Sequence, residues 1–517
     1  MGVALSLLGH KRCPLPEGVD SLKRQSQTFD DVSRTALYDQ TTQPSRLDDA
    51  DENTAYQNFL NGCKVSRGQS SVQRFTRSAL DGPYEWLTYA EVLQMVHDFG
   101  SALIHLGVPK GNESHVLLYA KNGSVEWVVA QLGALSQSMA VVTVFDDIDV
   151  DSFRAMLAAA GAGIIVCGSY GQACKALNHL DHMPALKIIV VMTLGLDEPD
   201  ETREKAAALC AKGGVQLLQM GDVLELGSSN PHQPFPPTLD DTCLIIHSSG
   251  SVSIPKGCTL THRQLMAGVR GGVVGPLKRG HLLIGKHGLR SSPEGSQNAH
   301  FSFMSPFCIS DQLMQAFAFM HGMRTGFFCG DTSKLLDDCQ LVAPHFLAGH
   351  PLLLQRVCDR VRQGLARRRF VTRLLFRLGC RYKQWLLDNR VITGSTIFDH
   401  LFFRNVQRLF GGNARFIVVG AMPTPESAMR LFRQLMACPV METVGLTECG
   451  VYCMSLPGCT LTNNVGPPSS SLRVKLVDAP ELEYFVAEGK GEVCLKGPTI
   501  MKGYNGAPEA TVLKRQA

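Results

Sequence analysis

The residues best suited to chemistry lie in a segment rich in hydroxyl groups and glycine near the middle of the chain. Residues 248–257 read SSGSVSIPKG and contain one lysine. Backbone amides and hydroxyls in a turn of this composition can surround a polyphosphate, and a lysine supplies a point charge. The Walker A pattern is absent, and an ordinary turn before a helix is the alternative interpretation. The candidate phosphate ligands are Ser248, Ser249, Gly250, Ser251, Lys256 and Gly257.

Two further segments offer groups that suit a nucleotide. Val444–Glu448 places the Thr447 hydroxyl and the Glu448 carboxylate at a loop tip, where they could meet a phosphate and Mg²⁺. A solvated surface loop is the alternative for this segment. Val418–Pro423 ends an apolar run with small residues, which suits the close approach of a flat ring as well as a plain turn between strand and helix.

The elements expected around these segments alternate between helices and strands. Apolar residues at helical spacing predict a helix over Thr88–Leu106, and Thr261 with Gln264 forms a capping-box pattern that opens another. This alternation predicts an α/β fold with a mainly parallel sheet covered on both faces, and its ligands would lie at the turns where strands end. The apolar runs that predict strands are 115–119, 140–145, 163–167, 187–192, 242–247 and 416–419.

Composition divides the chain into parts and excludes several classes of protein. Residues 1–75 are polar and predict an N-terminal extension, 76–517 form the main domain, and the portion from about 456 to 517 is rich in predicted β-structure. A net charge of only +4 argues against a dedicated nucleic-acid binder. The 17 cysteines include no C-x-x-C pair, so they predict reduced thiols rather than disulfides or a zinc ribbon. The charge-free windows 127–145 and 155–167 predict buried core elements rather than membrane spans.

Two features predict attachment to a membrane surface. The first residues match M-G-x-x-x-[ST], which makes Gly2 a candidate for acylation, with Cys13 as a second site; an unmodified terminus is the alternative. Residues 356–383 contain ten Lys and Arg side chains against the single acid Asp359. A basic amphipathic helix here could lie on an anionic membrane, and a solvated helix face is the alternative. The arginines that share one helical face are Arg369, Arg373, Arg377 and Arg381, while Phe370, Leu374, Leu375 and Leu378 gather elsewhere on the helix.

Together and in this order, the three segments resemble motifs of the adenylate-forming superfamily of acyl-CoA synthetases, luciferases and peptide-synthetase adenylation domains. The superfamily's phosphate loop, roughly [ST]SG[ST]TGxPKG followed by T-H, is similar to residues 248–257 with Thr261-His262. Its Y-G-x-T-E motif is similar to Val444–Glu448, and its G-x-x-P turn to Gly420–Pro423. The resemblance covers residues 84–511 and is strongest to the long-chain fatty acyl-CoA synthetases, on stretches such as YEWLTY at 84–89, LFGG at 409–412 and GPTIMKGY at 497–504.

The resemblance implies a fold and a reaction. The fold is the large N-terminal domain of adenylate-forming enzymes, with two packed αβ subdomains, mainly parallel sheets and a small β-rich subdomain. In the reaction a long-chain fatty acid attacks the α-phosphate of ATP to form acyl-AMP and pyrophosphate, and coenzyme A then displaces AMP. The implied location is the cytosolic side of membranes, such as the endoplasmic reticulum, or otherwise the cytoplasm.

The resemblance also implies roles for individual residues. Residues 248–257 would hold the β- and γ-phosphates. The implied catalytic residues are Lys256, which supports this loop, Thr447, which would contact the α-phosphate, and Glu448, which would bind Mg²⁺. The residues implied to bind the nucleotide around the adenine are Gly420, Ala421, Met422, Val444, Gly445 and Leu446.

The chain departs from the family pattern at five positions. Val252 and Ser253 stand where the family has Thr and Gly, and the added Cβ narrows the space for a phosphate. Val444 replaces a tyrosine that stacks on adenine in the family. Ile309 and Gln312 replace a His and a Glu near the acyl site.

Two main hypotheses follow for the function. One is a truncated or divergent ATP-dependent long-chain fatty acid–CoA ligase, and the other is a catalytically inactive protein that binds an acyl chain or a nucleotide. An adenylating enzyme for another carboxylate is a third. The family's C-terminal lid domain, which carries a catalytic lysine, would follow Ala517, so we expect this sequence to hold the N-terminal domain only.

Overall fold

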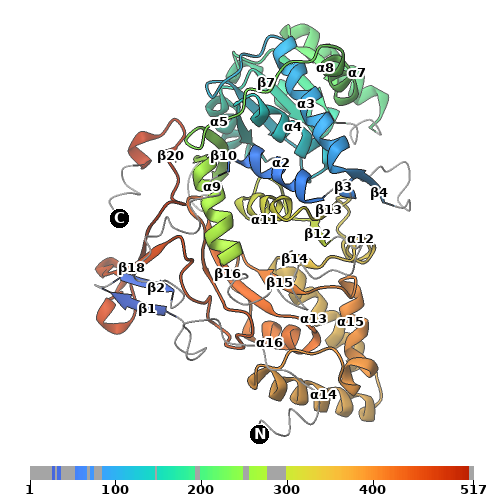
Figure 1. Ribbon diagram of the computed structural model, residues 1–517, viewed down its shortest axis with the longest axis vertical. Coiled ribbons are helices and arrows are strands. Elements are labelled where there is room, and N and C mark those ends of the chain that lie inside the picture. Colours follow the sequence, from blue (N-terminus) through green and yellow to red (C-terminus); the bar gives the residue numbers. More distant parts are fainter. Residues whose placement is uncertain are drawn as a thin grey trace.

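The computed structural model describes residues 26–29, 32–35, 53–66, 70–74, 84–145, 148–192, 198–248, 255–275 and 298–511. Within these residues the chain forms two eight-stranded sheets and one four-stranded sheet, with helices packed between and around them (Figure 1). Neighbouring strands at the centre of both large sheets are parallel. The predicted α/β fold with mainly parallel sheets is therefore confirmed.

The first large sheet has the strand order β20-β11-β10-β6-β5-β7-β8-β9. The strands from β10 to β9 run parallel, whereas β11 and β20 add to one edge in antiparallel pairing. The predicted strands are confirmed within one or two residues at most of their ends. Their bounds are β5 His115–Tyr119, β6 Ala140–Thr143, β7 Ile164–Cys167, β8 Ile188–Val191, β9 Gln216–Gln219, β10 Thr242–Ser248, β11 Lys256–Thr261 and β20 Gly503–Tyr504.

Both faces of this sheet are buried, which explains why its central strands are almost continuously apolar. Along β5, Val116 and Leu118 join one hydrophobic core, and Leu117 and Tyr119 join another. Three helices cover the first face: α3 (Tyr89–His105), α4 (Val125–Ser136) and α8 (Met220–Ser229). Three others cover the second face: α5 (Val150–Ala160), α6 (Tyr170–Leu177) and α7 (Asp200–Gly213).

The second large sheet has the order β17-β16-β15-β14-β12-β13-β3-β4. Antiparallel pairs occur at its two edges, between β16 and β17 and between β3 and β4. Its outer face carries the helices α12 (Leu335–Val342), α13 (Pro351–Ala366), α14 (Phe370–Asp388), α15 (Arg404–Leu409) and α16 (Glu426–Leu435). The strand bounds are β3 Ser70–Arg74, β4 Glu85–Thr88, β12 Ala299–Ser302, β13 Arg324–Phe327, β14 Phe346–Gly349, β15 Phe416–Val419, β16 Val440–Leu446 and β17 Gly450–Met454.

The largest hydrophobic core lies between the two large sheets. It includes side chains of α2 (Ala55–Ser66), α4, α9 (His262–Gly268) and α11 (Ile309–Met320) together with residues of both sheets. Figure 1 shows α2 and α11 in this middle layer. The helix α2 belongs to the stretch predicted as an N-terminal extension, and its Phe59 is completely buried against Tyr89 and Phe319.

The third sheet is antiparallel and small. Its order is β1 (Ser26–Phe29), β2 (Val32–Thr35), β18 (Arg473–Val477) and β19 (Glu492–Lys496), so an early hairpin joins a late one through the pairing of β2 with β18. The strands β18 and β19 lie in the portion from about 456 to 517 that was predicted to be rich in β-structure. The remaining short helices are η2 Leu180–His182, η4 Val269–Val274, η5 Asp399–Phe403, η6 Pro480–Leu482 and η7 Val486–Glu488.

Local sequence signals set several helix ends. Thr88 and Glu91 form a capping box at the start of α3, and Thr261 and Gln264 form the predicted one at the start of α9. The charge-free window 127–145 is the buried helix α4 followed by the buried strand β6, as predicted. Within the described parts of the chain, no helix is both long and apolar enough to cross a bilayer.

Candidate nucleotide site

The predicted phosphate loop connects two strands at an edge of the first sheet. Ser248 ends β10, Lys256 begins β11, and the two residues are paired in the antiparallel ladder. The hydroxyl of Ser248 donates a hydrogen bond to the carbonyl of Lys256, with 3.4 Å between the oxygens. The two ends of the loop are therefore fixed side by side. The predicted ligands Ser249, Gly250 and Ser251 lie outside the described residues.

Gly257 is required by close packing at the base of this loop. A Cβ at this position would lie 2.8 Å from Cγ2 of Ile245 and 3.4 Å from Nε2 of His247. Nδ1 of His247 is 2.9 Å from the carbonyl oxygen of Thr143 on the neighbouring strand, and burial lowers the pKa of this imidazole. His247 is thus a buried side chain held to the neighbouring strand at the base of the loop.

Lys256 and Glu448 meet at Tyr504, a residue that the sequence motifs did not single out as part of the site. The ammonium nitrogen of Lys256 lies 5.6 Å from the centre of the Tyr504 ring, within the range of a cation–π contact. The Tyr504 hydroxyl donates a hydrogen bond of 2.7 Å to Oε1 of Glu448. Burial and the neighbouring Glu448 carboxylate raise the pKa of Tyr504. The tyrosine therefore stays protonated and orients the carboxylate.

Backbone hydrogen bonds hold this cluster in place. The strand β20 pairs with β11, so Tyr504 stands opposite Cys258. The amide of Asn505 donates to the carbonyl of Gly257 at 2.7 Å, and the amide of Met501 donates to the carbonyl of Glu448 at 2.8 Å. The segment around residue 504 is thus attached on one side to the phosphate loop and on the other to the turn that carries Glu448.

The second predicted segment forms the hairpin between β16 and β17. Thr447 and Glu448 occupy its turn, and a bulge separates the pairs made by Val444 and Gly445. A Cβ on Gly445 would lie 2.7 Å from the carbonyl oxygen of Gly450, so only glycine fits this close approach of two strands. Leu446 is exposed beside the turn.

The third predicted segment adjoins the second. A Cβ on Gly420 would lie 2.5 Å from Cγ2 of Thr443, the residue before Val444, so the end of β15 is packed directly against β16. Ala421 has a φ of 75°, a left-handed conformation that is uncommon for residues other than glycine and is often found at functional sites. Met422 is exposed. Contacts thus connect the segments in series, from Gly420 to Thr443 and from Glu448 through Tyr504 to Lys256.

The region that departs most from the family pattern is a network of buried amides and one acid. Gln312 donates hydrogen bonds to the carbonyl of Pro306 and to Oε1 of Gln131, and it also accepts one from Gln131. Asp311, the neighbouring residue, is completely buried and accepts hydrogen bonds from Ser302 and Gln315. Burial raises the pKa of Asp311 to about 7. Sequence reasoning missed this acid because nothing in the local pattern shows that it is buried.

The residues present fit a magnesium ion that phosphate helps to hold. Across the residues that the structure describes, no group of three or more His, Cys, Asp and Glu side chains could hold a metal ion alone. Mg²⁺ commonly binds through one or two carboxylates, with substrate phosphates and water completing its coordination. Glu448, oriented by Tyr504, is a carboxylate of this kind beside the predicted phosphate loop.

The fold and this site define an α/β protein with a candidate nucleotide site at the strand ends. The sequence profile of the AMP-binding enzyme family matches residues 69–505, and the chain belongs to this family. Long-chain-fatty-acid–CoA ligase 6 of Rattus norvegicus is 30% identical over 515 residues, covering 98% of this chain and 70% of the rat protein. The Mus musculus protein of the same name is 31% identical, covering 88% of this chain and 62% of its own length. The chain thus spans roughly two-thirds of the length of these relatives.

A solved structure confirms the fold. The N-terminal domain of FACL13 from Mycobacterium tuberculosis matches with a TM-score of 0.57 at 16% identity, covering 89% of this chain and 93% of that domain. The chain therefore has the fold of the N-terminal domain of adenylate-forming enzymes.

Proposed function

We propose that this chain forms the nucleotide and fatty-acid site of an ATP-dependent long-chain fatty acid–CoA ligase. Family membership and the relatives support the reaction class. The observation that supports the proposal is the convergence of Lys256 and Glu448 on Tyr504, because it brings a cation and a carboxylate from distant parts of the sequence to one place. Coenzyme A is the proposed acceptor of the acyl group.

In the proposed first step, a fatty-acid carboxylate attacks the α-phosphate of ATP. Two anions must approach each other, so the main task of the protein is to offset negative charge and to align the reactants. Residues 248–257 would surround the β- and γ-phosphates, with Lys256 as a fixed positive charge. Thr447 would donate its hydroxyl to the α-phosphate, and Glu448 would hold Mg²⁺, which neutralises phosphate charge when bound. Gly420, Ala421 and Met422 on one side and Val444, Gly445 and Leu446 on the other would flank the adenine.

The test is exchange of labelled pyrophosphate into ATP in the presence of palmitate, measured with this chain extended by a C-terminal lid domain of the family, because that domain carries a catalytic lysine. We expect exchange that requires palmitate, and we expect Glu448→Gln and Lys256→Met to lower it by about 100-fold or more, the scale on which such electrostatic groups act. Lys496→Met, which removes an exposed lysine on β19, is the matched control and should leave the exchange unchanged.

The second candidate is a protein that binds nucleotide or acyl chain without turnover. It is favoured by the departures at Val252, Ser253, Ile309 and Gln312, since the last of these is an amide bonded to Gln131 where the family has a titratable acid. If the protein binds nucleotide in this way, we expect no exchange of pyrophosphate. Calorimetry should still detect ATP binding, and Glu448→Gln and Lys256→Met should weaken that binding. The absence of both exchange and ATP binding would contradict the ligase and the nucleotide site, and it would leave only a protein that binds an acyl chain.

We also propose that acylation of Gly2 attaches the chain to the cytosolic face of a membrane. The match to M-G-x-x-x-[ST] supports this proposal. Gly2→Ala should lower the share of the protein in the membrane fraction of cells lysed at high salt, where binding through charged side chains is screened. An unchanged share would exclude a role for acylation.

A further inference from the structure

The first half of α14 carries an apolar surface that the rest of the described protein does not cover. Its large side chains are between 39% and 67% exposed, although residues of this kind on a surface helix normally face the core. Contiguous exposed apolar side chains mark sites of interaction with a protein or a membrane. The members of this apolar row are Phe370, Val371, Leu374, Leu375 and Leu378.

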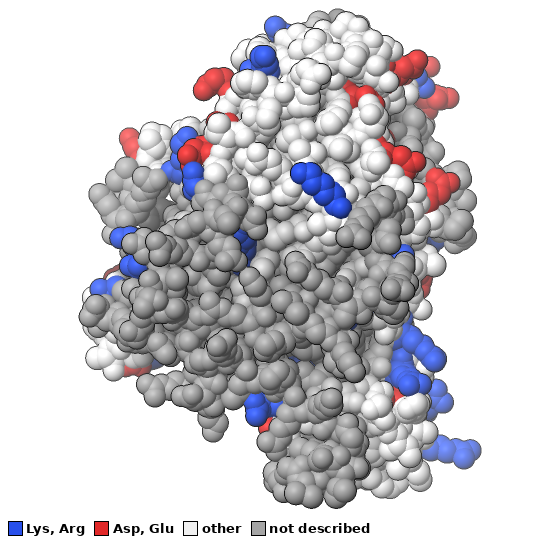
Figure 2. Space-filling view, viewed as in Figure 1, with Lys and Arg blue, Asp and Glu red and all other residues white. Residues whose placement is uncertain are grey.

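A row of arginines runs beside the apolar row. Arg369, Arg373, Arg377 and Arg381 are all exposed. In an α-helix, consecutive residues are about 100° apart around the axis, so this arginine row is adjacent to Phe370, Leu374 and Leu378 rather than opposite them. Figure 2 shows basic side chains gathered at the lower right margin, in the part of the molecule that α13, α14 and α15 form in Figure 1.

The surrounding charges leave this surface strongly positive. Between residues 356 and 383 the only acid is Asp359, and it forms an ion pair of 3.0 Å with Arg362 of the same helix. One basic residue counted in the sequence pattern does not belong to the surface. Lys383 is buried, so the expected basic face ends at Arg381.

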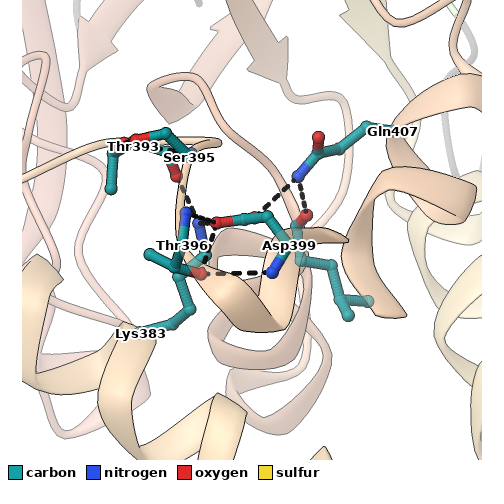
Figure 3. A network of polar contacts seen from close by, with 7 residues as sticks. Lys383, Thr393, Ser395, Thr396, Asp399 and Gln407 are labelled. Carbon is teal, nitrogen blue, oxygen red and sulfur yellow. Dashed lines mark hydrogen bonds and ion pairs between the residues drawn. The ribbon is translucent and has the colours of Figure 1, made fainter. Parts of the chain in front are cut away.

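Lys383 instead anchors the second half of α14. Its ammonium group lies 2.9 Å from Oδ1 of Asp399, and Figure 3 shows this pair inside a network with Thr396 and Gln407. The Thr396 hydroxyl donates to Oδ2 of Asp399 at 2.6 Å, and the amide of Gln407 donates to Oδ1 at 3.1 Å. On the buried side of the helix, Phe376 and Gly379 pack against the body of the protein. The helix is therefore fixed to the fold while its apolar and arginine rows face outward.

We propose that this face of α14 binds the surface of an anionic phospholipid bilayer. The apolar row would enter the boundary between head groups and acyl chains, and the arginine row would contact the phosphates, as interfacial amphipathic helices do. A second copy of this chain is the less suitable occupant. A symmetric interface would bring the arginine row of one copy close to that of the other, and the like charges would repel each other. The proposal does not depend on the proposed catalytic function.

The test is co-sedimentation of the full chain, produced without acylation, with vesicles of phosphatidylcholine alone or mixed with phosphatidylserine. We expect binding to the mixed vesicles only, and weaker binding at high salt. Each arginine near an anionic surface strengthens binding about fivefold, so Arg373→Gln, Arg377→Gln and Arg381→Gln together should weaken it by about 100-fold. The triple variant Phe370→Ser, Leu374→Ser and Leu378→Ser should also release the protein.

The matched control removes the same charge from the other half of the molecule. Arg203→Gln, Lys205→Gln and Lys212→Gln on α7 change three exposed basic residues and should leave vesicle binding unchanged. All variants should keep the wild-type unfolding midpoint, because every substituted side chain is exposed. Equal binding by the arginine variant and the control would overturn the proposal. A second result would also overturn it: the wild-type protein does not bind the mixed vesicles but forms dimers, as detected by light scattering. The triple variant Phe370→Ser, Leu374→Ser and Leu378→Ser would then abolish these dimers.

Discussion

Tyr504 orients the carboxylate of Glu448, although Tyr504 belongs to the first large sheet and Glu448 to a turn of the second. Its hydroxyl donates to the carboxylate, and its ring lies beneath the ammonium group of Lys256. A tyrosine with a raised pKa remains a hydrogen-bond donor over the physiological pH range. We regard it as a positioning residue, since it contacts Glu448 and Lys256, the two residues that we propose to act on the nucleotide.

Removing this hydroxyl should weaken binding of MgATP. Hydrogen bonds to charged groups contribute about 1.5–3 kcal/mol, so Tyr504→Phe should raise the dissociation constant of MgATP by roughly tenfold to a hundredfold. Titration calorimetry at a fixed magnesium concentration measures the change. Tyr484→Phe, which alters an exposed tyrosine, is the control. Unchanged affinity in Tyr504→Phe would show that the bond to Glu448 does not orient the site.

The buried acid Asp311 should make the stability of the protein depend on pH. Its pKa is raised to about 7, whereas an aspartate in an unfolded chain titrates near about 4. The folded state therefore holds the proton more tightly, and its free energy of unfolding falls as pH rises from ~4 to about 7, by up to ~4 kcal/mol. Asp311→Asn keeps an acceptor for Ser302 and Gln315 but cannot ionise. Urea midpoints at pH 5 and pH 8 should differ less in Asp311→Asn than in the wild type, and equal differences would contradict the prediction.

At the scale of elements, glycine sets how closely α8 approaches α3. A Cβ on Gly227 would lie 1.7 Å from the carbonyl oxygen of Asp98, whereas a Cβ on Gly221 of the same helix would meet nothing within 4 Å. Gly227→Ala must therefore move one helix relative to the other, while Gly221→Ala only gains helix propensity.

The two substitutions should have opposite signs. We expect Gly227→Ala to lower the free energy of unfolding by about 3 kcal/mol and Gly221→Ala to raise it by about 0.5–1 kcal/mol. Thermal unfolding followed by circular dichroism measures both. A Gly227→Ala protein as stable as Gly221→Ala would show that α8 shifts without cost.

The sequence predicted the elements better than it predicted their partners. Runs of apolar residues located β5, β7, β8 and β15 because these strands are buried on both faces. The capping box of α9 is local and was equally visible in the sequence. The sequence did not reveal that Tyr504 contacts Glu448 or that Lys383 pairs with Asp399. Each of these contacts depends on elements that come together only in the folded chain. The motif roles of Thr447 and Met422 remain predictions.

At the scale of the whole molecule, the segment predicted as an N-terminal extension contributes to the layer between the two large sheets. Phe59 of α2 is completely buried against Tyr89 and Phe319, and Asn58 donates a hydrogen bond to the carbonyl of Ala316 on α11. A residue in this position should stabilise the main fold as a core residue does.

We therefore expect Phe59→Ala to cost about 3–5 kcal/mol of unfolding free energy. Val65→Ala, at an exposed position of the same helix, should change it by less than about 0.5 kcal/mol. Chemical denaturation monitored by tryptophan fluorescence compares the two. A small effect of Phe59→Ala would mean that α2 can detach while the two sheets stay folded.

The bond between Tyr504 and Glu448 joins a strand of the first large sheet to a turn of the second. Any molecule that binds Glu448 therefore contacts a carboxylate that also connects the two halves of the protein, each built around one large sheet. The affinity of such a molecule and the mutual orientation of the halves are then coupled thermodynamically, and each must respond to a change in the other. A substitution that loosens the junction from afar should consequently be detectable as a change in nucleotide affinity, even where no altered side chain touches the nucleotide.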